Sequence, residues 1–107
     1  MRKTATSEFP ILDVLKERWS PRAYDSKLVE DEKVWSLLEA ARWSPSGNNS
    51  QPWSFIVTRK GDVAFDKLVD TLSSNNKKWA GNAPLLVMSV AKLTRADGSP
   101  NPYAYYD

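Results

Sequence analysis

The pattern of apolar and polar positions along the chain predicts three helices. It is strongest from Glu30 to Trp43, where Val34, Leu37, Leu38 and Ala41 recur at the spacing of one helix face. Acidic residues fill the first turn of this segment, where the helix dipole favours them. Two shorter segments with similar spacing predict further helices: Phe9–Arg18 and Val63–Leu72.

Two segments are predicted to be strands. Trp53–Thr58 is rich in β-branched and aromatic residues. Leu85–Val90 is apolar almost throughout, which suits a strand covered on both faces of a sheet. The order helix-helix-strand-helix-strand predicts a mixed α/β domain with helices packed on a sheet. Polar, turn-forming segments separate these elements, and a further element begins at the end of the chain: Ser44–Pro52, Lys60–Asp62, Ser73–Lys78, Ala96–Pro100 and then Pro102–Asp107.

Composition adds the size and setting of the domain. A chain of 107 residues with 41% hydrophobic residues is typical of one globular domain. The longest apolar run, Leu85–Ala91, is far shorter than the ~20 residues that a membrane span needs. No apolar segment near the N-terminus has the form of a signal peptide. We therefore expect a cytoplasmic protein without a membrane partner.

Two absences from the sequence narrow the possible chemistry. The chain has no Cys, which excludes a disulfide framework, a thiolate nucleophile and a sulfur-ligated metal. It has no His, which excludes an imidazole base and the usual zinc sites. If the protein is an enzyme, we expect a cofactor to carry the reaction and no metal to take part. The net charge of +2 and the scattered basic residues give no reason to expect a nucleic-acid partner.

The first candidate site is the run Arg18-Trp19-Ser20-Pro21-Arg22. Two arginines with a hydroxyl between them, at a proline turn, could gather donors around one anionic group, because guanidinium groups suit phosphates and electron-rich ring edges. On residue chemistry alone, these residues more simply form a basic helix end that complements the dipole, followed by a Ser-Pro turn.

Two polar loops are the other candidates. The loop from Pro45 to Trp53 carries six consecutive small or amide residues between prolines, more polar groups than a plain connector needs. It could bind a ligand or simply join a helix to a strand. Asn75–Trp79 could likewise contribute to a site, or it could be a solvated loop anchored to the core by Trp79.

Taken together, these segments resemble the nitroreductase family. The resemblance rests on the Arg-x-Ser-x-Arg run, on the long stretch Leu38–Val57 and on Asn76-x-x-Trp79 leading through Ala83-Pro84 into an apolar strand. It extends over about residues 9 to 107. The long stretch is the specific part, and the flanking motifs follow in the order expected of the family.

The resemblance implies an α+β fold, with a mixed sheet flanked by helices, that forms a homodimer with FMN at the interface. Trp19 stands where the family commonly has Arg or His, so we expect it to contact the flavin through its backbone. The residues that the resemblance assigns to FMN fall into three groups: Arg18, Trp19, Ser20 and Arg22 at its pyrimidine edge, ribityl chain or phosphate; Pro45, Ser46, Gly47 and Asn49 reaching the flavin of the partner subunit; and Asn76 at the isoalloxazine of its own subunit.

The reaction that the resemblance implies is ping-pong hydride transfer. NAD(P)H would reduce the flavin, and a small acceptor such as a nitroaromatic or quinone would then use the same pocket. The flavin carries this chemistry, so no catalytic side chain is predicted. Arg22, and with it Arg18, would supply positive charge that stabilises the reduced flavin.

One difference from the family concerns length. Family members are markedly longer, and their second halves add helices, strands and a basic residue that binds the flavin phosphate. We therefore expect residues 1–107 to form a single domain that is incomplete at its C-terminus. The alternative function is a non-catalytic module that binds flavin or dimerises with the same fold.

Overall fold

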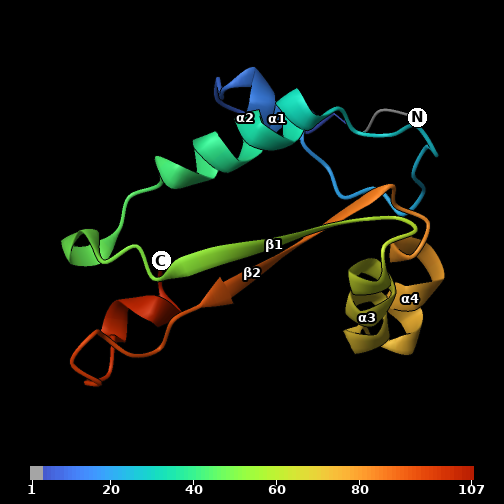
Figure 1. Ribbon diagram of the computed structural model, residues 1–107. Helices are drawn as coiled ribbons and strands as arrows, with labels where there is room; N and C mark the ends of the chain where they lie inside the picture. Colours follow the sequence, from blue (N-terminus) through green and yellow to red (C-terminus); the bar gives the residue numbers. More distant parts are fainter. Residues whose placement is uncertain (1–3) are drawn as a thin grey trace.

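The computed structural model describes residues 4–107. They form a long ribbon of two strands with helices around it (Figure 1). The two strands pair antiparallel, with Trp53 opposite Ala91 and Arg59 opposite Leu85. The order of elements is α1 (Asp13–Glu17), α2 (Asp31–Arg42), the 3-10 turn η1 (Gly47–Asn49), β1 (Trp53–Arg59), α3 (Val63–Thr71), α4 (Ser74–Ala80), β2 (Leu85–Ala91) and the 3-10 turn η2 (Pro102–Tyr105).

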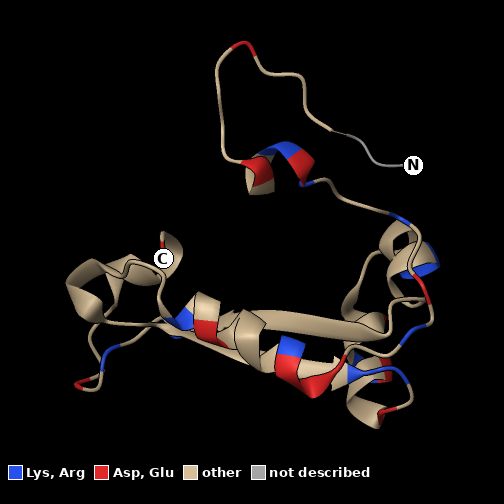
Figure 2. Cartoon of the chain, turned by 90° about the horizontal axis from the view of Figure 1, so that it is seen from above, with Lys and Arg blue, Asp and Glu red and all other residues tan. Residues whose placement is uncertain are grey.

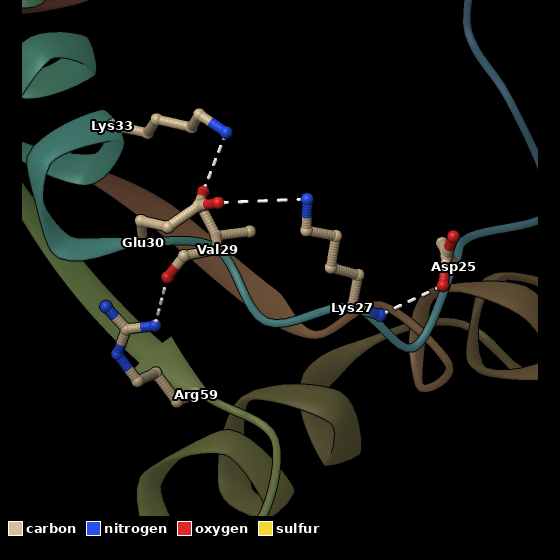
Figure 3. Close-up of polar contacts among 6 residues, drawn as sticks. All are labelled: Asp25, Lys27, Val29, Glu30, Lys33 and Arg59. Atoms are coloured by element: carbon tan, nitrogen blue, oxygen red, sulfur yellow. Dashed lines mark hydrogen bonds and ion pairs between the residues drawn. The ribbon is translucent and has the colours of Figure 1, made fainter.

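Helix α2 runs beside the ribbon, and its N-terminal end is tied to the end of β1. Arg59 donates from Nη1 to the carbonyl oxygen of Val29 at 2.7 Å (Figure 3). Arg59 also forms an ion pair with Asp31. Glu30 pairs with Lys33 at 2.7 Å, and this hydrogen bond is the main reason that the pKa of Glu30 lies below its ordinary value. These contacts fix where α2 begins and so confirm the helix predicted from residue 30 to 43.

The core is small and lies where α3 and α4 meet the ribbon. Phe65 of α3 and Thr58 of β1 are each 2% exposed, and Ala80 and Ala83 are buried beside them. Phe65 is one of the apolar residues that predicted α3, and the hydroxyl of Thr58 is satisfied by the carbonyl oxygen of Leu86 at 3.3 Å. The side of the ribbon opposite α2 therefore carries most of the packing.

Two sequence predictions about helices are wrong. The first helix begins only at Asp13, not at Phe9, because the backbone is still extended at Leu12. It buries no side chain, and a short helix without a packed face gains little from propensity alone. The predicted linker Ser73–Lys78 is instead mostly helix α4, started by the Ser73 side chain, which accepts a hydrogen bond from the Asn76 backbone.

Strand β2 lies at the predicted place but is not covered on both faces by the described residues. Only its first residues are half-buried, and Val87, Met88 and Val90 are 36–42% exposed. On the opposite strand Phe55 and Ile56 are also exposed. The ribbon thus presents apolar side chains on both faces.

The shape of the chain is correspondingly open. Its radius of gyration is 16.8 Å, against about 13 Å for a compact chain of this length. Its accessible surface is 8893 Å², where a folded monomer of its mass would expose about 6,000 Å². The N-terminal arm, residues 4–20, stands clear of the ribbon in Figure 2. Its apolar residues are exposed: Phe9, Ile11, Leu12, Val14 and Leu15.

Candidate functional site

A polar pocket of about 390 Å³ lies against helix α4. It is lined by Arg22 of the first candidate motif and by four residues of the helix: Asn75, Asn76, Lys78 and Trp79. The fold thus brings together Arg22 and Asn76, two residues singled out from separate parts of the sequence. Asn75, Lys78 and Trp79 belong to the candidate segment Asn75–Trp79, in which only Asn76 was assigned a flavin contact from the sequence.

Stacked aromatic rings bring Arg22 to the helix. The ring of Tyr24 lies on that of Trp79, with centroids 6.0 Å apart and planes 27° from parallel. The Tyr24 hydroxyl also donates to the carbonyl oxygen of Pro21 at 3.3 Å. An offset stack of this kind contributes about 0.5–1.5 kcal/mol beyond burial. The extended segment after α1 is therefore anchored at Tyr24, two residues beyond Arg22.

The pocket is cationic and rich in donors. Lys77 is engaged by Asp70 at 3.1 Å, whereas Arg22 and Lys78 have no acidic partner among residues 4–107. Lys78 reaches the side-chain oxygen of Asn75 at 3.5 Å. Two cations beside two amides suit an anion or the electron-rich edge of a ring, since amides donate and accept while cations hold charge.

The rest of the first motif does not join this pocket. Arg18 donates to the Ser20 hydroxyl at 3.3 Å, and both side chains are exposed. Trp19 is 38% exposed and none of the three lines the cavity. They lie on the arm between α1 and the Tyr24 anchor, so within one chain only Arg22 of this motif reaches α4.

The second predicted loop has an unusual backbone. Three residues that are not glycine have positive φ angles, namely Asn48 at 55°, Asn49 at 52° and Gln51 at 43°. Asn tolerates this left-handed region better than most residues, because its short side chain can bond locally. The side-chain oxygen of Asn49 accepts from the Gln51 amide at 2.7 Å. Pro45 is exposed at the start of the loop.

Asp107 holds this loop from the far end of the sequence. The Ser46 hydroxyl donates to its carboxylate at 2.7 Å, and the Gly47 backbone N–H donates to both carboxylate oxygens at 3.1 and 3.2 Å. The Tyr103 ring packs so closely on Gly47 that a Cβ there would lie 2.2 Å from it. Neither Tyr103 nor Asp107 was predicted to bear on the site, and only their place in the last predicted element gave any signal.

The loop and the pocket lie at opposite ends of the ribbon. The loop leads into Trp53 at the start of β1, while α3 and α4 gather at the Arg59 end (Figure 1). Seven residues of strand separate these ends by about 23 Å. A mononucleotide-sized ligand in the α4 pocket therefore cannot also touch the loop of the same chain.

Residues 4–107 contain no group of three or more His, Cys, Asp or Glu side chains placed to bind a metal ion. In the same part of the chain, no helix has both the length and the apolar character needed to cross a membrane.

Comparison with known proteins identifies the family to which this α+β fold belongs. The sequence profile of the nitroreductase family matches residues 15–85. This chain belongs to the nitroreductase family. The match includes Arg22, the loop at residues 45–52 and the pocket residues of α4.

Individual relatives agree with this assignment. The chain is 42% identical over 66 residues to the "Major NAD(P)H-flavin oxidoreductase" of Aliivibrio fischeri, covering 61% of this chain and 30% of that protein. It is 42% identical over 91 residues to a "Putative NAD(P)H nitroreductase" of Haemophilus influenzae, covering 84% of this chain and 40% of that protein. The chain thus spans less than half the length of these curated relatives.

The fold has a close counterpart among solved structures. A crystal structure described as an "oxidoreductase containing FMN" superposes with a TM-score of 0.81 at 31% identity, covering 94% of this chain and 57% of that one. A "putative nitroreductase in complex with fmn" from Desulfovibrio desulfuricans gives a TM-score of 0.66 at 34% identity, covering 78% and 47% respectively. The predicted α+β class is confirmed.

Proposed function

We propose that this chain is the FMN-binding part of an oxidoreductase that takes hydride from NAD(P)H and passes it to a small acceptor. The observation that carries the proposal is the cationic pocket of Arg22, Asn76 and Lys78, found in a member of this family. NAD(P)H and an acceptor such as a nitroaromatic or quinone use the pocket in turn, in a ping-pong scheme. Because NAD(P)H is a cytoplasmic reductant, we place the protein in the cytoplasm.

The residues present fit FMN. A pocket of about 390 Å³ lies within the ~300–1,000 Å³ range of small-ligand sites. Bound FMN would supply the hydride chemistry, which a chain without His or Cys does not provide from its own side chains. Arg22 and Lys78 hold positive charge where an electron-rich ring edge would lie, and the amide of Asn76 orients it. Preorganised charge of this kind favours the reduced state of whatever ring it faces.

A second copy of the chain completes the site in this proposal. The loop residues Pro45, Ser46, Gly47 and Asn49 cannot reach the α4 pocket of their own chain, but two chains related by a two-fold axis can place each loop at the other's pocket. The exposed apolar arm gives such a dimer surface to bury. We propose that Arg18, Trp19 and Ser20, which lie at the end of the arm next to Arg22, meet the ligand in that assembly.

Both faces of the ribbon carry exposed apolar side chains that this chain alone does not bury. We propose that residues 1–107 act as one domain whose remaining surface is covered by polypeptide equivalent to the part of the relatives that this chain does not span. Uncovered apolar strands and open sheet edges promote association. The 107-residue chain alone is accordingly expected to self-associate and to oxidise little NAD(P)H even with excess FMN.

The test is a titration with FMN of the full protein, meaning this chain together with the polypeptide proposed to cover it. Flavin absorbance and light scattering are measured on a sizing column. The expected result is a yellow dimer that oxidises NADH or NADPH in the presence of a quinone. A dimer that binds FMN without turnover would instead support the non-catalytic module. A protein that stays colourless at saturating FMN would refute the proposal.

A further inference from the structure

The loop at residues 45–51 depends on a contact that the family resemblance did not supply. Ser46 and Gly47 are half-buried against the segment that contains Tyr103 and Asp107. The three hydrogen bonds from them to the Asp107 carboxylate join residues 60 and 61 positions apart in sequence. No other long-range side-chain hydrogen bond from the described residues reaches this loop.

These bonds consume the donors of Ser46 and Gly47. A serine hydroxyl has one proton to donate, and here it points to Asp107. The Ser46 oxygen in turn accepts from the Gln51 backbone N–H at 2.9 Å. The backbone N–H of Gly47 is shared between the two carboxylate oxygens. Neither residue retains a donor at these atoms for a ligand, whereas the Asn49 amide uses only its oxygen and keeps both N–H groups.

We propose that Asp107 is a positioning residue, which holds the Ser46–Gly47 turn so that Asn49 presents its amide to the flavin of a partner chain. The inference rests on the proposed function for its ligand. It reassigns Ser46 and Gly47 from flavin contact to support of the loop. Asp107 acts through them and does not itself touch the cofactor.

The backbone of the loop explains why such support is needed. Left-handed φ angles at Asn48, Asn49 and Gln51 persist only where the surroundings fix them. Asp107 fixes the start of this stretch through two successive residues, and the Tyr103 ring closes over Gly47. Only glycine at position 47 lets the Tyr103 ring come so close, because a Cβ there would lie 2.2 Å from the ring.

The experiment compares Asp107→Ala with Asp107→Asn in the full protein. Two quantities are measured: the FMN dissociation constant by flavin fluorescence, and the exchange rate of the Gly47 amide proton by NMR without FMN. Asp107→Ala should weaken FMN binding at least tenfold and speed Gly47 exchange, because both loop donors lose their acceptor. Asp107→Asn keeps one acceptor oxygen and should recover part of both quantities.

Two further variants test whether the effect passes through Ser46. Ser46→Ala alone should weaken FMN binding less than Asp107→Ala, and adding it to Asp107→Ala should cost nothing more, because the two residues act as one unit. Asp97→Ala is the matched control. Asp97 accepts similar bonds from the hydroxyl and backbone of Ser99 at 2.7 and 2.9 Å in a different turn, so its loss should leave both quantities unchanged.

Three outcomes would overturn the inference. Tighter FMN binding by Asp107→Ala would mean that the carboxylate competes with the ligand for the Ser46 and Gly47 donors. Faster Gly47 exchange with unchanged FMN affinity would make the contact purely structural, and unchanged exchange would mean that Asp107 does not hold the loop. A wild-type protein that binds no FMN would refute the proposed function, and the Gly47 exchange rates alone would then decide whether Asp107 holds the loop.

Discussion

The two ends of the β1–β2 ribbon carry different kinds of structure. At the Arg59 end, helices α3 and α4 bury Phe65 and Ala80 and form the polar pocket on a packed base. At the Trp53 end, the loop has no buried apolar residue of its own beyond Pro52 and is held by polar bonds to Asp107. One end is fixed by packing and the other by hydrogen bonds. In the proposed dimer, each end of the ribbon supplies half of a site, and the half-sites of two chains together form one complete site.

The largest expected effect comes from removing the packing at the pocket end. Phe65 is 2% exposed, and Phe65→Ala should lower the free energy of unfolding by about 3–5 kcal/mol, the usual cost of truncating a buried aromatic residue. Val63→Ala is the control, because Val63 lies on the same helix α3, is 73% exposed and should cost much less. Urea denaturation of the full protein measures both. Equal losses would mean that Phe65 does not pack in a core at the Arg59 end.

A mixed dimer tests the division of the site between the two ends. One chain carries Arg22→Ala and the other Asn49→Ala, so that one site is intact and the other has lost both residues. The damaged site should bind FMN more weakly by about 2–4.5 kcal/mol, the sum of one hydrogen bond to a charged group and one neutral bond. Calorimetric titration should then give one tight site per dimer. Two equally weakened sites would place both ends of the ribbon at the same ligand within one chain.

Arg22→Ala in both chains isolates the pocket end. It should weaken FMN binding by about 1.5–3 kcal/mol, because the guanidinium has no acidic partner in the described residues and is available to a charged or electron-rich group. The melting temperature should hardly change, since Arg22 is exposed. Arg95→Ala, in the turn before Pro100, removes an exposed arginine outside the pocket. Equal FMN affinity for both variants and the wild type would mean that Arg22 is a solvated surface residue that does not contact FMN.

Sequence patterns predicted the helices and strands whose own residues show a clear apolar pattern. Helices α2 and α3 and both strands begin and end within one or two residues of their predicted places, because periodic or continuous apolar positions define them. Helix α1 was overestimated, since none of its residues is buried by the part of the chain that the structure describes. Helix α4 was missed, because its polar residues Asn75–Lys78 concealed the cap at Ser73.

The residues of the candidate site were likewise predicted only in part. Arg22 and Asn76 were named from motifs, and the fold places them at one pocket. Lys78 lay inside the candidate segment Asn75–Trp79 but was given no role of its own, because a lysine in an apparent linker looks solvated. Asp107 was missed because a contact across 60 residues leaves no local pattern, and the separation of loop and pocket depends on the length of β1, which no single motif records.

The smallest expected effect lies on α2, which connects the two ends. Near its C-terminus, just before the loop, Glu39 accepts bonds from Arg42 at 2.7 and 2.9 Å and from the Trp43 indole at 2.9 Å. These bonds, chiefly those of Arg42, lower the pKa of Glu39 from 4.5 to about 2. A lowered pKa in the folded state stabilises the protein above pH 4.5, and that stabilisation is lost as the pH falls from 4.5 to about 2. Glu39→Gln should therefore lower the melting temperature by at most a few degrees at pH 7, because the cluster is exposed, and the difference should disappear below pH 2, where Glu39 is protonated. Glu8→Gln is the control, because it removes the same charge from an exposed side chain outside the helices with no ion pair among the described residues. A difference that stays constant across this range would show that the ionised Glu39 does not fix the helix end from which the loop departs.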